Sequence, residues 1–228
     1  MTSIMIGDLK INVIKKKIKN LHLSVHPPDG WVRITVPDMM NDEAIRSFAI
    51  SKLSWIKKQR AKFQAQERQP EREFVSGESY YYQGRHYLLN VIYTNKKQRV
   101  EIDGHKYINL YVREGATKDR RGKVMTEWYR NQLKSQIPPF IEKWEKRMGV
   151  KVDSWGVKLM KTRWGTCNTK ARRIWVNLEL AKNSPRCLEY IIVHEMVHLL
   201  ERLHNKKFVS YMDQFLPNWR SVKKELNG

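Results

Sequence analysis

The residues best suited to chemistry lie in the stretch IIVHEMVHLLERLH at 191–204. His194 and His198 are four residues apart, so a helix places both imidazoles on one face, close enough to bind one metal ion. Glu195 is rotated by about 100° from His194 and can stand beside that metal without being a ligand. Zinc held by neutral imidazoles lowers the pKa of a bound water to about 7, and a neighbouring carboxylate can carry its proton to a leaving amine. The pattern predicts a metal-dependent hydrolase with Glu195 as the general base.

A catalytic zinc normally has three protein ligands, and His204 is the candidate for the third. On an unbroken helix His204 would point about 80° away from His194 and about 120° away from His198. The chain must therefore leave the helix between about 199 and 203 and fold back. In the metzincin pattern a glycine makes this turn, and Glu201 occupies its position here. With a turn of another geometry, the three histidines would hold one zinc ion per chain.

The alternative interpretation is an ordinary core helix with incidental histidines. The flanking residues make this helix apolar nearly all round, which is typical of a helix packed inside a protein. They are Tyr190, Ile191, Ile192, Val193, Val197, Leu199 and Leu200. Ionisable groups in such a setting are costly without a partner, and a metal ion is the usual one.

Apolar alternation and turn residues upstream predict β structure and one long helix. Residues 21–36 read as a β-hairpin around the turn PPDG, and residues 41–68 read as a helix. Residues 79–113 predict a meander of short antiparallel strands, with turns at Gly84 and at Asp103-Gly104.

The second half of the chain is more helical. Residues 117–149 have helical spacing, and Pro138-Pro139 inside them predict two helices or one kinked helix. Strands are expected within 150–160 and 172–180. Ser184-Pro185 then predict an N-cap with proline at the first helical position, and a last helix is expected over roughly 205–226.

The net charge of the chain indicates which classes of partner it favours. The 228 residues include 44 Lys and Arg against 23 Asp and Glu, a net charge of +21. Such a charge favours nucleic acid or other acidic partners, but it is also compatible with a solvated basic surface. No apolar stretch approaches the roughly 20 residues of a membrane span, no secretory signal begins the chain, and two cysteines make no disulfide framework. We therefore expect a cytoplasmic protein without a membrane partner.

Four segments near the C-terminus resemble a known family. They are TRWGTC at 162–167, IWVNLEL at 174–180, VHEMVHLLERLHNKKF at 193–208 and LPNWRSVKKEL at 216–226. They are similar to the YgjP-like (DUF45) metallopeptidase domain, a relative of SprT-like zinc proteases in the zincin group. Upstream, KIKNLHLSVHPPDGWVRITVP resembles the family's N-terminal hairpin.

The resemblance implies metal ligands at His194, His198 and His204 and a general base at Glu195. It also implies that Glu201 is the family's ordinary residue, so the missing glycine is normal for this group. Thr166 and Leu203 depart from the family pattern, which has Ser and often Asn there, and neither is a proposed ligand.

Residues beside the motif have two interpretations each. Arg163, Trp164 and Cys167 either belong to the substrate cleft or form a packed turn, and packing is the commoner role for such residues. The strand at 172–180 either presents an edge to an extended peptide, with Asn177 assisting, or is an ordinary core strand.

Together these observations predict an α+β fold. Residues 1–115 would form an N-terminal antiparallel β region with one long helix, and residues 116–228 a helical connector and a zincin-like catalytic region. The predicted function is a zinc metallopeptidase acting on a peptide or protein substrate. One alternative is a basic nucleic-acid-associated protein whose zinc site is structural or serves cleavage of DNA-bound proteins. Another is hydrolysis of a non-peptide amide by the same residues.

Overall fold

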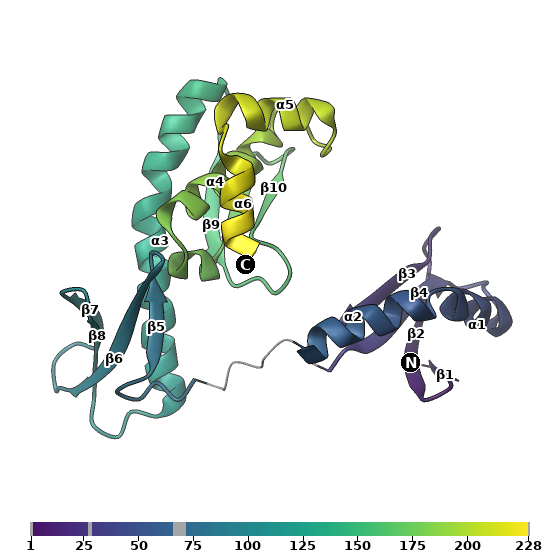
Figure 1. Ribbon diagram of the computed structural model, residues 1–228, viewed down its shortest axis with the longest axis horizontal. Coiled ribbons are helices and arrows are strands. Elements are labelled where there is room, and N and C mark those ends of the chain that lie inside the picture. The colour runs from purple at the N-terminus through teal and green to yellow at the C-terminus, as the bar shows by residue number, and fades with distance from the viewer. Residues whose placement is uncertain (1, 27–28, 66–71, 228) are drawn as a thin grey trace. The chain divides into compact units, whose positions relative to one another are not determined.

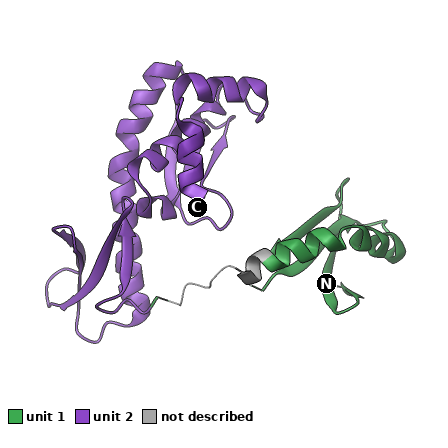
Figure 2. Cartoon of the chain, in the orientation of Figure 1, with its two compact units in different colours: residues 1–72 green, residues 73–228 purple. Residues whose placement is uncertain are grey.

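The computed structural model describes residues 2–26, 29–65 and 72–227, and it confirms an α+β fold. The chain divides into two compact units, Met1–Arg72 (unit 1) and Glu73–Gly228 (unit 2), each coloured separately in Figure 2. No helix among the described residues is long and apolar enough to cross a membrane.

Unit 1 is a four-stranded sheet packed against helices. Its strands are β1 (Thr2–Ile6), β2 (Leu9–Lys16), β3 (His22–His26) and β4 (Trp31–Pro37), in the order β1-β2-β4-β3. The sheet, α1 (Asp42–Ser51) and the helix that follows it (Leu53–Ala65) enclose an apolar core. The members of that core are Leu9, Ile11, Val13, Val32, Ile34, Val36, Ile45, Ala49 and Ile56.

The predicted helix over 41–68 is two helices. α1 ends at Ser51, and α2 (Leu53–Ala65) follows after a one-residue turn at Lys52, which has φ −102° and ψ 3°. Residues 66–68 of the prediction, and Pro27 and Pro28 of the predicted hairpin turn, lie outside the described residues. The hairpin itself is confirmed, since β3 and β4 pair antiparallel.

Unit 2 begins with a second four-stranded sheet of order β5-β6-β8-β7. Its strands are β5 (Ser79–Tyr82), β6 (Arg85–Tyr93), β7 (Arg99–Asp103) and β8 (Tyr107–Val112). The hairpin turns predicted at Gly84 and Asp103-Gly104 are present. The expected antiparallel pairing holds within the hairpins but is wrong for β2–β4 and β6–β8, which are parallel. Alternation of apolar and polar residues identifies a strand but not its partner, so the sequence could not predict whether strands outside a hairpin pair parallel or antiparallel.

A single long helix, α3 (Lys118–Met148), connects this sheet to the rest of unit 2. It begins with the Thr117 side chain accepting from the Arg120 N–H and ends at Gly149 in the left-handed conformation. Pro138 and Pro139 lie inside it without dividing it. A buried stripe runs past both prolines at intervals of three or four residues, so packing holds the helix together where backbone hydrogen bonds are missing. The stripe is Met125, Trp128, Tyr129, Leu133, Ile137, Ile141, Trp144 and Met148.

The predicted division at 115/116 differs from the observed one after Arg72. In Figure 1 the β5–β8 sheet lies beside the first half of α3. Tyr82 from β5 packs its ring against Trp128 and donates a hydrogen bond to Gln132 at 2.8 Å, both on α3. The second sheet therefore shares the core of the C-terminal region.

The remaining elements of unit 2 surround the motif helix. They are β9 (Ser154–Lys158), β10 (Gly165–Asn168), β11 (Arg173–Asn177), the 3₁₀ helix η1 (Leu178–Lys182), α4 (Pro185–Val197), α5 (Lys206–Phe215) and α6 (Trp219–Asn227). The three strands form a sheet of order β10-β11-β9, which leaves β10 at an edge. The single last helix predicted over 205–226 is two helices, because Leu216 leaves the helical conformation (φ −136°, ψ 74°) directly before Pro217.

Candidate metal centre

The motif helix α4 begins as predicted with Pro185 in its first turn, but Ser184 does not cap it with its side chain. The Ser184 hydroxyl donates instead to the Glu225 carboxylate on α6 at 2.7 Å. Glu189 on the same helix accepts from the indole of Trp144 at 3.0 Å and pairs with Lys143, which ties α4 to α3. The helix is thus held by tertiary contacts on two sides.

The chain leaves the helix directly after Val197, as the third histidine requires. Leu199 and Leu200 donate to carbonyls three residues back, and the Leu203 N–H donates to the Glu201 carboxylate at 3.2 Å. Among the described residues other than glycine, a positive φ occurs at Phe74, Gln83 and Arg172, none of them in this turn. The turn therefore uses tightened helical bonds and a Glu201 side-chain bond where the metzincin pattern uses glycine.

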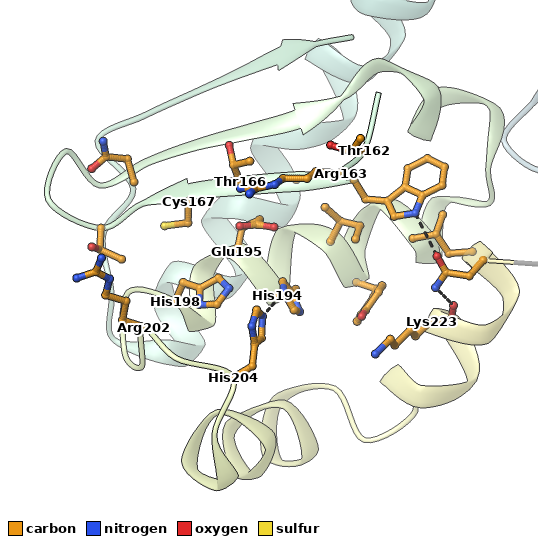
Figure 3. Close-up of a pocket in the computed structure, with 18 of the residues that line it drawn as sticks. Thr162, Arg163, Thr166, Cys167, His194, Glu195, His198, Arg202, His204 and Lys223 are labelled. Atoms are coloured by element: carbon orange, nitrogen blue, oxygen red, sulfur yellow. Dashed lines mark hydrogen bonds between the residues drawn. The ribbon is translucent and has the colours of Figure 1, made fainter. Parts of the chain in front are cut away.

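This turn brings His204 back to the other two histidines. One ring nitrogen from each of His194, His198 and His204 lies within 4.8 Å of the others, an arrangement that can hold a metal ion. The Nε2 atoms of His194 and His204 are 3.1 Å apart. Zn–N bonds of about 2 Å in a tetrahedral site place ligand nitrogens about 3.3 Å apart, which is close to the spacing of this pair. Figure 3 shows the three rings converging.

The protonation states also suit a metal. Burial lowers the pKa of His194 to about 3, and the nearby charges of His198, His204 and Lys223 make smaller contributions in the same direction. Burial lowers the pKa of His198 as well, against the effect of its hydrogen bond to the Glu201 carbonyl. The Nδ1 of His198 lies 3.3 Å from that carbonyl oxygen. If Nδ1 carries the proton, Nε2 is left with its lone pair for a ligand.

Glu195 lies beside the triad and is 5% exposed. Burial raises the pKa of its carboxyl to about 8, and the Arg163 guanidinium acts in the opposite direction. A carboxyl with a raised pKa in a cleft is typical of a general acid or base. Gly165 on β10 makes room for it, because a Cβ there would meet Glu195 Oε1 at 2.7 Å and Ile191 Cγ2 at 2.8 Å.

A cavity of about 820 Å³ opens over these residues. One wall is β10 with the loops at its two ends, and α4, the turn after it and α6 supply the others. Arg163, Trp164 and Cys167 all line it, so the interpretation that placed them at the cleft is the one that the geometry favours. Burial raises the pKa of the Cys167 thiol to about 11, with the Glu195 charge adding to it, which disfavours a thiolate metal ligand.

The strand at 172–180 does not offer an edge. β11 lies between β10 and β9, and Asn177 is 4% exposed. The Asn177 amide donates to the carbonyls of Met160 and Arg163 at 2.9 and 2.8 Å. Asn177 therefore fixes the loop that precedes β10, and the edge strand beside the histidines is β10 itself.

Two residues that the sequence did not single out complete the site. The Phe208 ring lies 4.7–4.9 Å from the ring centres of all three histidines, and Asn205 caps its helix by accepting from the Phe208 N–H. Lys223 on α6 lines the cavity. A cap residue just after His204 was the available signal for Phe208. The position of Lys223 depends on the turn at Pro217.

A histidine triad beside a buried glutamate in an open cleft is typical of metallopeptidases. The sequence model of the family described as "YgjP-like, metallopeptidase domain" matches residues 19–228, so the chain belongs to that family. No curated protein matches it.

Two crystal structures are similar to part of the chain. The metallopeptidase zymogen of Pyrococcus abyssi abylysin is 15% identical, with 39% of this chain and 89% of that chain covered and a TM-score of 0.36. The metallopeptidase zymogen of Methanocaldococcus jannaschii jannalysin is 18% identical, with 40% and 87% covered and a TM-score of 0.37.

Proposed function

We propose that this protein is a zinc-dependent metallopeptidase in which His194, His198 and His204 hold one zinc ion and Glu195 is the general base. The observation that carries the proposal is the convergence of three imidazole nitrogens within 4.8 Å, beside a carboxyl group that is 5% exposed. Membership of a metallopeptidase family supports it.

The chain's own residues divide the work. A zinc ion at this site would supply a Lewis acid and a water of lowered pKa. Glu195 accepts a proton at its carboxylate and donates it to the leaving amine. Phe208 packs against the three imidazoles and holds their orientation. Gly165 has no side chain, which lets the backbone of β10 lie directly beside the Glu195 carboxyl.

The edge strand β10 is suited to hold the substrate. It pairs with β11 on one side only, so its outer backbone groups can pair with an extended peptide running past Glu195. A peptide held in this way would present its carbonyl groups along the line of the triad, which favours a peptide over a small amide as substrate.

Metal content and activity test the proposal together. Elemental analysis of protein purified without added metal should give about one zinc per chain, and His204→Ala should lose most of it because two ligands bind zinc weakly. Glu195→Gln should keep the metal and lose about 10²- to 10⁴-fold in kcat/KM on a cleaved peptide. Wild-type protein that takes up no metal even when zinc is offered would refute the proposal.

A second candidate function is association with nucleic acid, and the observation that favours it lies in unit 1. The strands β1–β4 contain Lys10, Lys15, Lys16 and Arg33 and no Asp or Glu. Binding of a labelled oligonucleotide that falls steeply with salt and is unchanged in Glu195→Gln would support this role. Binding that is absent at 50 mM salt would exclude it.

A further inference from the structure

The cleft over the histidines is lined by four basic side chains and a single carboxylate. The basic residues are Arg163, Lys170, Arg202 and Lys223, and the carboxylate is the buried Glu195. All four basic residues are exposed. A peptide lying in the cleft would therefore meet positive charge.

These charges are not neutralised within the protein. None of the four cations has a carboxylate within 4.0 Å among the residues that the structure describes. On α6 the contrast is direct, because Arg220 pairs with Asp213 and Glu225 pairs with Arg186. Lys223, between them, has its Nζ 5.7 Å from the Trp219 ring centre, a contact that leaves its charge intact.

The cations lie on both sides of the triad. Figure 3 shows Arg202 beyond His198 on one side and Lys223 beyond His194 and His204 on the other. Arg163 precedes β10 and Lys170 follows it, so the edge strand has a cation near each end. An extended peptide along β10 would pass positive charge before and after the bond next to Glu195.

We infer that the substrate is an acidic peptide, with Asp or Glu side chains on both sides of the bond that is cleaved. This rests on the proposed peptidase function and names the substrate class of that site. Unpaired cations in a cleft attract carboxylates and repel Lys and Arg, so they set specificity and encounter rate. A free C-terminal carboxylate has the same chemistry, but cations on both sides of the triad favour side-chain carboxylates.

The test uses zinc-loaded full-length protein and internally quenched peptides that differ only in the four residues around their centre. Those residues are Glu, Gln or Lys in three peptides with an amidated C-terminus, and a fourth peptide is the Glu sequence with a free C-terminus. We expect kcat/KM to fall in the order Glu, Gln, Lys, by roughly fivefold or more at each step, and the differences to shrink at high salt. The Glu peptide with a free C-terminus should be cleaved no faster than its amide. If the free acid alone is cleaved, the cleft reads the chain end and the inference is wrong.

Charge reversal locates the preference. Lys223→Glu and Arg202→Glu should each reduce cleavage of the Glu peptide and increase cleavage of the Lys peptide by about fivefold. Lys224→Glu is the matched control, because Lys224 is the next residue on α6, is exposed and does not line the cavity. Equal effects of Lys223→Glu and Lys224→Glu would mean that net charge, and not the cleft, sets the preference.

The inference and the proposed function fail in different ways. Equal cleavage of the Glu, Gln and Lys peptides overturns the inference and leaves a peptidase. If no peptide is cleaved, the proposed function fails. Binding of the same labelled peptides to zinc-loaded Glu195→Gln then still measures whether the cleft prefers acidic peptides. An oligonucleotide that binds more tightly than the Glu peptide, and loses affinity in Lys223→Glu but not in Lys224→Glu, would assign the cleft to nucleic acid and overturn the inference.

Discussion

Units 1 and 2 are built alike but bury different kinds of residue. Each packs helices against a four-stranded sheet that combines hairpins with one parallel pair. Among the described residues, every buried side chain of unit 1 is apolar, whereas unit 2 buries Asn109, Asn177 and Glu195. Burying a polar group costs free energy unless the group is hydrogen-bonded. A buried polar group without such a partner therefore indicates a role other than stability.

Two of these three polar groups have structural partners. Asn109 accepts from the Asn90 amide at 2.9 Å, and Asn177 holds the loop before β10. Among the residues that the structure describes, none forms a hydrogen bond with the Glu195 carboxyl, and burial raises its pKa to about 8. The two units therefore differ in what their cores do. The core of unit 1 serves stability, whereas unit 2 retains one buried carboxyl that lowers its stability.

The largest expected effect tests whether the two cores are separate. Ile34 in unit 1 and Ile192 in unit 2 are both fully buried, and Ile→Ala in such a site costs about 2–5 kcal/mol. Ile34→Ala should lower the unfolding transition of unit 1 and leave metal binding intact. Ile192→Ala should lower the transition of unit 2 and weaken metal binding. Calorimetry and zinc titration of both variants measure this, and metal loss in Ile34→Ala would mean that the units depend on one another.

The second test concerns the space beside Glu195. Gly165→Ala should displace the carboxyl and cost roughly 10²-fold in kcat, because small misplacements of catalytic groups are expensive. Gly156→Ala on β9 is the control, since its Cβ would meet the Trp175 ring at 2.4 Å, away from the cavity lining. It should lower thermal stability with kcat per folded molecule unchanged. Equal losses of kcat in both variants would argue that Gly165 matters only for folding.

The third test concerns the packing around the triad. Phe208→Leu removes the ring that contacts all three imidazoles and should weaken zinc affinity about tenfold, as loss of a residue that orients ligands does. Phe215→Leu is the matched control, because Phe215 lies on the same helix but packs against Trp144 and Tyr211 instead of the histidines. Competition with a chelator gives both affinities. If Phe215→Leu weakens zinc binding as much, the effect belongs to the helix and not to the ring.

The sequence predicted the convergence of the three histidines better than the pairing of the strands, and the reason is distance along the chain. His194 and His198 are related by helical geometry alone, and His204 needed one local turn, in which the Leu203 N–H donates to the Glu201 carboxylate where the metzincin pattern has glycine. The parallel pairing of β6 with β8 and the central place of β11 are set by tertiary contacts, so the sequence left open whether the strand at 172–180 is an edge or a core strand.

The residues that were missed share this cause. Phe208 reaches the site from the start of α5, and Lys223 reaches it from α6, whose direction depends on the break at Pro217. A single helix over 205–226 would have pointed Lys223 elsewhere. Sequence patterns therefore find residues that act within one element and miss those that a neighbouring element brings in.

The smallest expected effect is that of Glu195→Gln on the reactivity of Cys167, a thiol that reports on unit 2 alone because unit 1 contains no cysteine. Burial, reinforced by the Glu195 charge, raises the pKa of this thiol to about 11, so the reactive thiolate is scarce at pH 8 and increases with pH up to that value. Alkylation by iodoacetamide, followed by mass spectrometry, should be about a hundredfold slower than in the urea-unfolded chain. Glu195→Gln removes only the lesser cause and should speed alkylation a few-fold. A rate at pH 8 equal to that of the unfolded chain would show that the wall beside Glu195 is open to solvent, which would remove the main reason for the raised pKa of both groups.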